Sequence, residues 1–128
     1  MKTKLLGVVG VLSAVVILLA VSGPVLAHHG EANYDTTKVI TIKGTITDFE
    51  FINPHVQVYM DVKDDHGNVE HWICEATSPN MLVREGWDKN TLKPGDVISA
   101  SGHRAKNGSP TLRLMEIVTA DGKNLGHL

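Results

Sequence analysis

The sequence predicts an all-β domain with one short helix, in which five strands close into a Greek-key barrel. Apolar and polar residues alternate along short stretches bounded by turn residues, which is the pattern of half-buried strands. One helix-like stretch, residues 78–86, lies between the third and fourth predicted strands. A β-sandwich needs about seven strands, which is more than this chain can supply. Three strands, a helix and two strands in so short a chain are typical of the five-stranded OB-fold.

The first strand is predicted over residues 38–48, where isoleucines alternate with threonine and lysine. Gly44 lies within this strand, at a position that would tolerate a sharp bend. After Asp48 the apolar positions move to Phe49 and Phe51, which changes the parity of the alternation. This change indicates a bulge or a corner at the end of the strand.

The second and third strands form a hairpin whose register can be read from the sequence. Asn53-Pro54 ends the preceding stretch, because proline has no N–H and holds the residue before it extended. Residues 64–67 form a type I turn followed by a left-handed glycine. This turn places Met60 opposite Trp72 and Val58 opposite Cys74, so that apolar residues meet on one face. The other, more polar face carries four pairs: Asp61 with His71, Tyr59 with Ile73, Gln57 with Glu75, and His55 with Thr77.

The remaining elements follow from turn and cap signals. Ser78 is expected to cap a helix of about two turns with Pro79 at its first position, and Gly86 is expected to end it. The fourth strand covers residues 97–104, and the Asn-Gly of the loop at 106–110 predicts a second hairpin that leads into a fifth strand at 111–119. Residues 121–128 are expected to turn away as a short tail.

The first 27 residues have the three parts of a secretory signal: two lysines, an apolar run that breaks at Ser22-Gly23-Pro24, and a cleavage site that ends at Ala27. Cleavage after Ala27 is predicted, which places the mature protein in the periplasm or outside the cell. The alternative is an uncleaved membrane anchor, because the apolar run is about as long as the shortest membrane spans. The mature chain would consist of a polar arm at 28–37, a barrel domain at 38–120 and the tail.

The charge of the chain narrows its possible partners, and its cysteine content excludes an internal disulfide. Removal of Lys2 and Lys4 with the signal leaves 10 basic residues against 14 acidic ones, and an acidic domain repels phosphate backbones. Nucleic acid is therefore not expected as a partner. The only cysteine, Cys74, can form no internal disulfide, and its place on the apolar face predicts a buried thiol.

Several short motifs give a family resemblance that extends over nearly the whole mature chain. They are Ala27-His28-His29, Lys43-Gly44-Thr45, Ile52-Asn53-Pro54-His55, Ser78-Pro79-Asn80, Arg84-Glu85-Gly86-Trp87, Leu92-Lys93-Pro94-Gly95-Asp96 and Ala105-Lys106-Asn107-Gly108-Ser109-Pro110. As a set they resemble the bacterial domain-of-unknown-function family 6152. The resemblance implies a small exported protein and assigns no biochemical role.

The sharpest chemical hypothesis is copper. Cleavage after Ala27 would make His28 the first residue, so that its amine and imidazole could chelate one ion, with His29 as a nearby third nitrogen. Nitrogen ligands suit Cu(II), which prefers tetragonal nitrogen and oxygen sites. Another transition metal would also fit these ligands, and the alternative is that this polar stretch only assists export.

Function is predicted to be non-enzymatic binding of a small ligand or a protein partner on the polar face of the second and third strands. The expected ligand-binding residues are Asn53, His55, Tyr59 and His71. His55 and His71 are six positions apart along the hairpin, or about 20 Å at about 3.3 Å per residue, so they cannot share one ion. His71 is expected to bond its cross-strand partner Asp61, and His55 to brace the Asn-Pro corner. His55 could also meet the arm.

Overall fold

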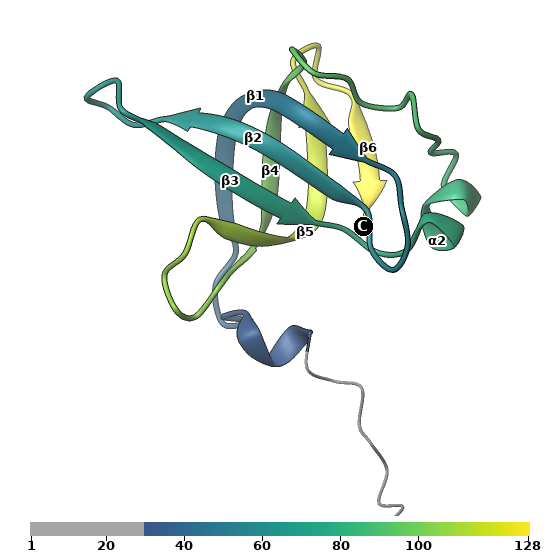
Figure 1. The fold of residues 1–128 in the computed structure, drawn as a ribbon, viewed down its shortest axis with the longest axis horizontal. Coiled ribbons are helices and arrows are strands. Elements are labelled where there is room, and N and C mark those ends of the chain that lie inside the picture. The colour runs from purple at the N-terminus through teal and green to yellow at the C-terminus, as the bar shows by residue number, and fades with distance from the viewer. Residues whose placement is uncertain (1–29) are drawn as a thin grey trace, which may run out of the picture.

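A computed structural model of the protein describes residues 30–128. It contains one 3-10 helix, one α-helix and six strands (Figure 1). In chain order these are η1 (Glu31–Asn33), β1 (Ile40–Glu50), β2 (Gln57–Lys63), β3 (Val69–Glu75), α2 (Pro79–Arg84), β4 (Val97–Arg104), β5 (Thr111–Thr119) and β6 (Asn124–His127).

The strands form one antiparallel sheet that closes on itself. Their order is β3-β2-β1-β4-β5-β6, and β3 also pairs in parallel with the start of β5, from Ile73 beside Thr111 to Glu75 beside Arg113. This pairing closes β1 to β5 into the predicted barrel, with α2 at one end (Figure 1). Within residues 30–128, no helix is long and apolar enough to cross a membrane.

The predicted hairpin register is confirmed. Met60 pairs with Trp72 and Val58 with Cys74, and on the outer face Asp61 lies opposite His71, Tyr59 opposite Ile73 and Gln57 opposite Glu75. The predicted pair of His55 with Thr77 lies outside the paired residues of β2 and β3. β1 has a register shift between Ile46 and Asp48, which confirms an irregularity at the predicted end of that strand. The register therefore fixes which side chains of β2 and β3 face outward.

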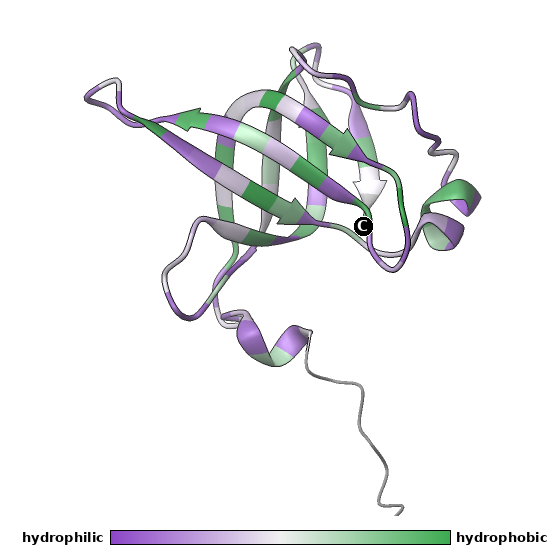
Figure 2. Cartoon of the chain, viewed as in Figure 1, coloured by the Kyte–Doolittle hydropathy of each residue, from purple (hydrophilic) through white to green (hydrophobic). Residues whose placement is uncertain are grey.

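The barrel interior is filled by one apolar cluster, to which every strand from β1 to β5 contributes. Apolar and polar residues alternate along the strands in Figure 2, as expected for strands with one face in a core. From α2, Leu82 is fully buried and Pro79 is also buried. The expected side-chain cap by Ser78 is wrong: its carbonyl oxygen, not its hydroxyl, accepts the N–H bonds of Met81 and Leu82.

The C-terminal residues do not turn away as a tail. They form β6, which pairs with β5 through Val118 beside Asn124 and Glu116 beside His127. The indole N–H of Trp87 donates to the carbonyl oxygen of Leu125 at 3.0 Å, and Leu125 packs against the core. The turn predicted at residues 121–122 is present, but it returns the chain to the sheet rather than turning it away.

Candidate functional site

Glu75, the last residue of β3, is the centre of a polar cluster on the outside of the barrel. Its neighbours Cys74 and Ala76 are buried, so strand alternation turns Glu75 outward. One carboxylate oxygen, Oε1, is in direct contact with His55 Nδ1 and lies 3.2 Å from Arg113 Nη1. The other oxygen, Oε2, accepts a hydrogen bond from the Tyr34 hydroxyl at 3.2 Å. We call Tyr34, His55, Glu75 and Arg113 the Glu75 cluster.

The barrel closure brings these four residues together. Arg113 is the direct parallel neighbour of Glu75 across the β3–β5 pair, and its guanidinium also donates to the carbonyl oxygen of Ala76 at 2.7 Å. His55 lies just before β2, in the connection from β1 (residues 51–56). The cluster therefore joins this connection to both strands of the closing pair.

Tyr34 comes from the arm, which is docked onto the barrel rather than free. The arm and the end of β4 exchange backbone hydrogen bonds, from Asp35 N–H to Arg104 O at 2.9 Å and from Lys106 N–H to Asn33 O at 2.9 Å. The Tyr34 side chain is only 7% exposed. Burial, together with the nearby Glu75 carboxylate, raises the pKa of Tyr34 to about 12. Its phenol is therefore protonated at neutral pH and acts as the donor to Glu75.

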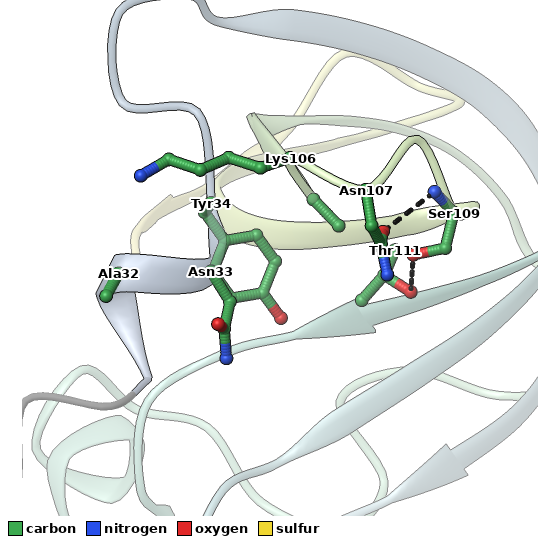
Figure 3. Close-up of a pocket in the computed structure, with 8 residues that line it drawn as sticks. Ala32, Asn33, Tyr34, Lys106, Asn107, Ser109 and Thr111 are labelled. Atoms are coloured by element: carbon green, nitrogen blue, oxygen red, sulfur yellow. Dashed lines mark hydrogen bonds between the residues drawn. The ribbon is translucent and has the colours of Figure 1, made fainter.

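A cavity of about 460 Å³ lies between the arm and the β4–β5 loop (residues 105–110). Figure 3 shows the Tyr34 ring as one wall, with the loop and the start of β5 opposite it. The lining residues are mostly polar and uncharged. They are Ala32, Asn33, Tyr34, Ala105, Lys106, Asn107, Ser109 and Thr111.

Arg104 holds the β4–β5 loop in place. Its guanidinium donates to the carbonyl oxygens of Gly108 at 2.7 Å and Ser109 at 3.3 Å, and it lies 5.0 Å from the ring centroid of Trp72. Within the loop, the Asn107 side-chain oxygen accepts the N–H of Ser109 at 3.0 Å (Figure 3). The cavity therefore has one wall fixed by Glu75 and the other fixed by Arg104.

The four predicted ligand-binding residues do not converge on one site. His55 belongs to the Glu75 cluster, where it pairs with Glu75 rather than bracing the corner. His71 bonds Asp61 at 2.6 Å, which confirms its predicted partner, and its side chain is 83% exposed. Asn53 is exposed beside the cis peptide bond to Pro54. None of the four lines the cavity just described.

Tyr59 lies on the outer face between β1 and β3. Its hydroxyl bridges two side chains, at 3.1 Å from Glu50 Oε2 and 3.0 Å from Gln57 Oε1. Partial burial, followed by the bond to the Glu50 carboxylate, raises the pKa of Tyr59. Tyr59 therefore presents its ring on a face whose edge is acidic.

The predicted metal ligands His28 and His29 lie outside the described residues. Within residues 30–128, no group of three or more His, Cys, Asp or Glu side chains is placed to hold a metal ion. Cys74 is fully buried, 3.7 Å from Met60 Sδ, and burial raises the pKa of its thiol to about 12. As predicted from its position on the inward face, the thiol fills the core.

Sequence reasoning did not identify Tyr34, Arg113 or the role of Glu75. Tyr34 is the one large, partly apolar side chain in an otherwise polar arm, which is a sequence signal for an anchored arm. Arg113 meets Glu75 only through the parallel β3–β5 pair, for which the sequence carries no local signal. The β4–β5 loop was predicted as a turn but not as a cavity wall.

Comparison with solved structures supports the predicted architecture. The crystal structure of the mitochondrial single-stranded DNA binding protein Rim1 from S. cerevisiae aligns with 65% of this chain and 93% of its own, at a TM-score of 0.50 and 10% sequence identity. Such a likeness concerns the fold alone, and it confirms the OB-fold prediction. No curated protein matches the sequence. The model of a family of unknown function, DUF6152, matches residues 14–113, and the chain belongs to this family.

Proposed function

We propose that this protein is an exported, non-enzymatic binding module that holds a small ligand, rich in hydroxyl and amide groups, between its arm and the β4–β5 loop. The observation that carries the proposal is the cavity walled by Tyr34 and this loop. Its volume falls in the range of small-molecule sites, about 300 to 1,000 Å³. In OB-folds, the β4–β5 loop and the face of β2 and β3 are the usual places for ligands.

The lining favours a neutral, polar ligand. The amides of Asn107 and Asn33, the hydroxyls of Ser109 and Thr111, and the Tyr34 ring offer hydrogen bonds beside an apolar surface, which is the combination that sugars use. A longer ligand or a protein partner would continue over the β2–β3 face towards Tyr59 and His55.

Charge argues against nucleic acid as the ligand. The Rim1 protein is a single-stranded DNA binding protein, but the outer face of β2 and β3 here carries the carboxylates of Asp61 and Glu75, with Glu50 beside it in β1. A strand of phosphates needs a basic groove. Binding rather than catalysis is favoured because Tyr34 and Cys74 are both held protonated, so neither is activated as a nucleophile.

A nuclear magnetic resonance titration of the 15N-labelled protein beginning at His28 tests this proposal. Triacetylchitotriose offers hydroxyls and amides, and maltotriose offers hydroxyls alone. We expect chitotriose to shift the amide signals of residues 31–34 and 105–111, and the Lys106→Ala, Asn107→Ala double variant to weaken binding at least tenfold. Asn68→Ala in the β2–β3 turn is the control. If neither sugar shifts the amide signals of the arm and the β4–β5 loop, the proposal is contradicted.

We propose copper binding through His28 and His29 as a second function. The specific observation in its favour is the docked arm: the Tyr34 hydroxyl is fixed on the same carboxylate that holds His55. The docking holds Tyr34, which follows His28 and His29 in the arm, on the same carboxylate group as a barrel histidine. The test compares Cu(II) affinity for protein beginning at His28 with that for protein carrying one extra alanine in front. Equal affinities would contradict a site that uses the free amine.

A further inference from the structure

A second cavity, of about 270 Å³, lies beside the docked arm, between the arm and the end of β4. Its lining residues are Asp35, Lys38, Ile40, Arg104, Ala105 and Lys106. It shares Ala105 and Lys106 with the cavity described above, and in Figure 3 the Lys106 side chain extends away from Asn107 and Ser109 and across the arm. Whereas the first lining is mostly uncharged, this one contains three cations and one anion. We call it the basic cavity.

The basic cavity exists because the arm loops away from the sheet. The arm meets β4 at two places, with Tyr34 beside Ala105 and Ile40 beside Gly102. Between these two pairs the arm has five residues and β4 has only two. Extra residues on one of two paired segments are left out of the ladder and bend it outward. The arm loop (residues 35–39) therefore stands away from the end of β4 and leaves a hollow beside it.

Hydrogen bonds fix both ends of the arm loop. At its start, Asp35 N–H donates to Arg104 O at 2.9 Å, and near its end His103 Nδ1 donates to Lys38 O at 2.8 Å. Within the loop, Asp35 Oδ1 accepts bonds from the Thr37 hydroxyl at 2.5 Å and the Thr37 N–H at 3.1 Å. The cavity is thus formed before a ligand arrives, and binding does not have to order the loop.

The basic cavity keeps a net positive charge. Arg104 is held by uncharged groups, the carbonyl oxygens of the β4–β5 loop and the Trp72 ring, which fix the guanidinium without cancelling its charge. Within residues 30–128, neither Lys38 nor Lys106 forms an ion pair. Asp35 is the one carboxylate in the lining, so three positive charges stand against one negative charge. The site therefore favours an anion.

We propose that the basic cavity binds one anionic group of a small molecule, a carboxylate or a phosphate. Arginine presents a planar fork of N–H donors that matches either group, and lysines beside it add positive charge. The volume is below the range of about 300 to 1,000 Å³ for whole small-molecule sites, so a compact anion fits best. A long polyanion is not expected, because the domain as a whole is acidic and repels it.

The experiment titrates the 15N-labelled protein, expressed from the full-length sequence, with glycerate, glycerol phosphate and glycerol at constant ionic strength. We expect one or both anions to shift the amide signals of residues 35–40 and 103–106, and neutral glycerol to leave them in place. Lys38→Gln should weaken binding at least threefold, and the Lys38→Gln, Lys106→Gln double variant at least tenfold. Lys38→Arg, which keeps the charge, should retain the affinity.

Lys63→Gln is the matched control, because Lys63 is an exposed lysine at the end of β2 and lines neither cavity. Binding of one anion and not the other would support the inference and identify the group. Shifts that are absent with both anions, or equal with glycerol, would overturn it. Equal affinities for Lys38→Gln and Lys63→Gln would show attraction to the protein's charge in general and would also overturn it.

This inference does not depend on the proposed sugar site. Triacetylchitotriose is uncharged, so Lys38→Gln should leave its affinity unchanged. If chitotriose fails to bind while glycerate or glycerol phosphate binds in the expected way, the basic cavity stands and the sugar site falls. The reverse result would leave the sugar site and refute the basic cavity as an anion site.

Discussion

Gly102, in β4, lies where two backbones come too close for any side chain. A Cβ atom there would overlap the carbonyl oxygen of Arg113 in β5, far inside van der Waals contact. Gly44 in β1 is similar, because its Cβ would overlap the carbonyl oxygen of Asp61. A glycine is therefore needed at position 44 because β2 approaches β1 closely there. The reason expected from the sequence was different, namely that glycine would tolerate a sharp bend.

We predict that Gly102→Ala destabilises the domain by about 1 to 3 kcal/mol or more, because the new Cβ would clash with a backbone carbonyl group that cannot rotate away. Urea unfolding followed by circular dichroism measures the loss. Gly30→Ala is the control, since nothing lies within 4 Å of its Cβ position and its φ is −68°. The control should change stability by less than about 0.5 kcal/mol. If Gly102→Ala were as stable as the unaltered protein, the close approach of β4 and β5 at this position would be refuted.

Alkaline pH should destabilise the fold through Tyr34 and Cys74. Both have pKa values of about 12 in the folded protein, raised from ordinary values of 10.0 and 9.0, so above pH 9 the unfolded chain releases protons that the folded protein retains. The stabilisation is complete below the unfolded values and is lost as pH rises to about 12, by up to about 1.4 kcal/mol per pH unit for each group.

Unfolding free energies measured between pH 8 and 11 test this prediction. Cys74→Ala should lower stability at every pH because it leaves a gap in the core, but it should flatten the slope above pH 9. Tyr34→Phe should flatten the slope above pH 10. If neither substitution alters the slope of unfolding free energy against pH, groups other than Tyr34 and Cys74 cause the alkaline sensitivity.

At the scale of the element, β6 is the part of the fold that the sequence did not predict. Four residues make a weak strand signal, and the turn before them reads equally well as the start of a tail. What holds the strand is tertiary: the Trp87 indole bonds the Leu125 carbonyl, and Leu128 N–H bonds the Met115 carbonyl at 2.9 Å. Such partners are distant in sequence and leave no local pattern.

Truncation after Gly122 should therefore lower the unfolding free energy by about 2 kcal/mol or more, through the lost packing of Leu125 and Leu128 and an unpaired Trp87 donor. Thermal unfolding measures it. The matched control is Lys123→Ala, an exposed residue whose backbone pairing is unaffected. A truncated protein as stable as the full chain would make β6 dispensable.

At the scale of the whole molecule, antiparallel pairs between adjacent segments could be predicted and long-range contacts could not. The β2–β3 register followed from one turn and from matched apolar pairs, and the bond between His71 and Asp61 followed from that register. Tyr34, Glu75 and Arg113 meet only when the arm docks and β3 pairs in parallel with β5. The candidate site is made of these non-local contacts, so its residues were only partly foreseen.

The prediction of export also concerns the whole chain. We predict that the protein expressed in a bacterial host loses its first 27 residues and begins with His28, because an apolar run breaks at Ser22-Gly23-Pro24 and is followed by the small residue Ala27. Intact mass spectrometry of the periplasmic fraction measures the terminus. Ala27→Leu, which removes the small residue at the cleavage position, should leave the signal attached. Full-length protein in the membrane fraction would favour the uncleaved anchor.

The span of the Glu75 cluster along the chain has a consequence for folding order. Glu75 is 41 residues from Tyr34 and 38 from Arg113, whereas the β2–β3 hairpin needs only contacts across one turn. Closing such large loops costs entropy that is recovered only once the partners have met, so long-range pairings tend to form slowly. The hairpin is expected to form early and the cluster last. A newly made chain would then acquire the candidate site only when its barrel is complete, and a kinetically trapped, open barrel would lack the site although most of its strands were paired.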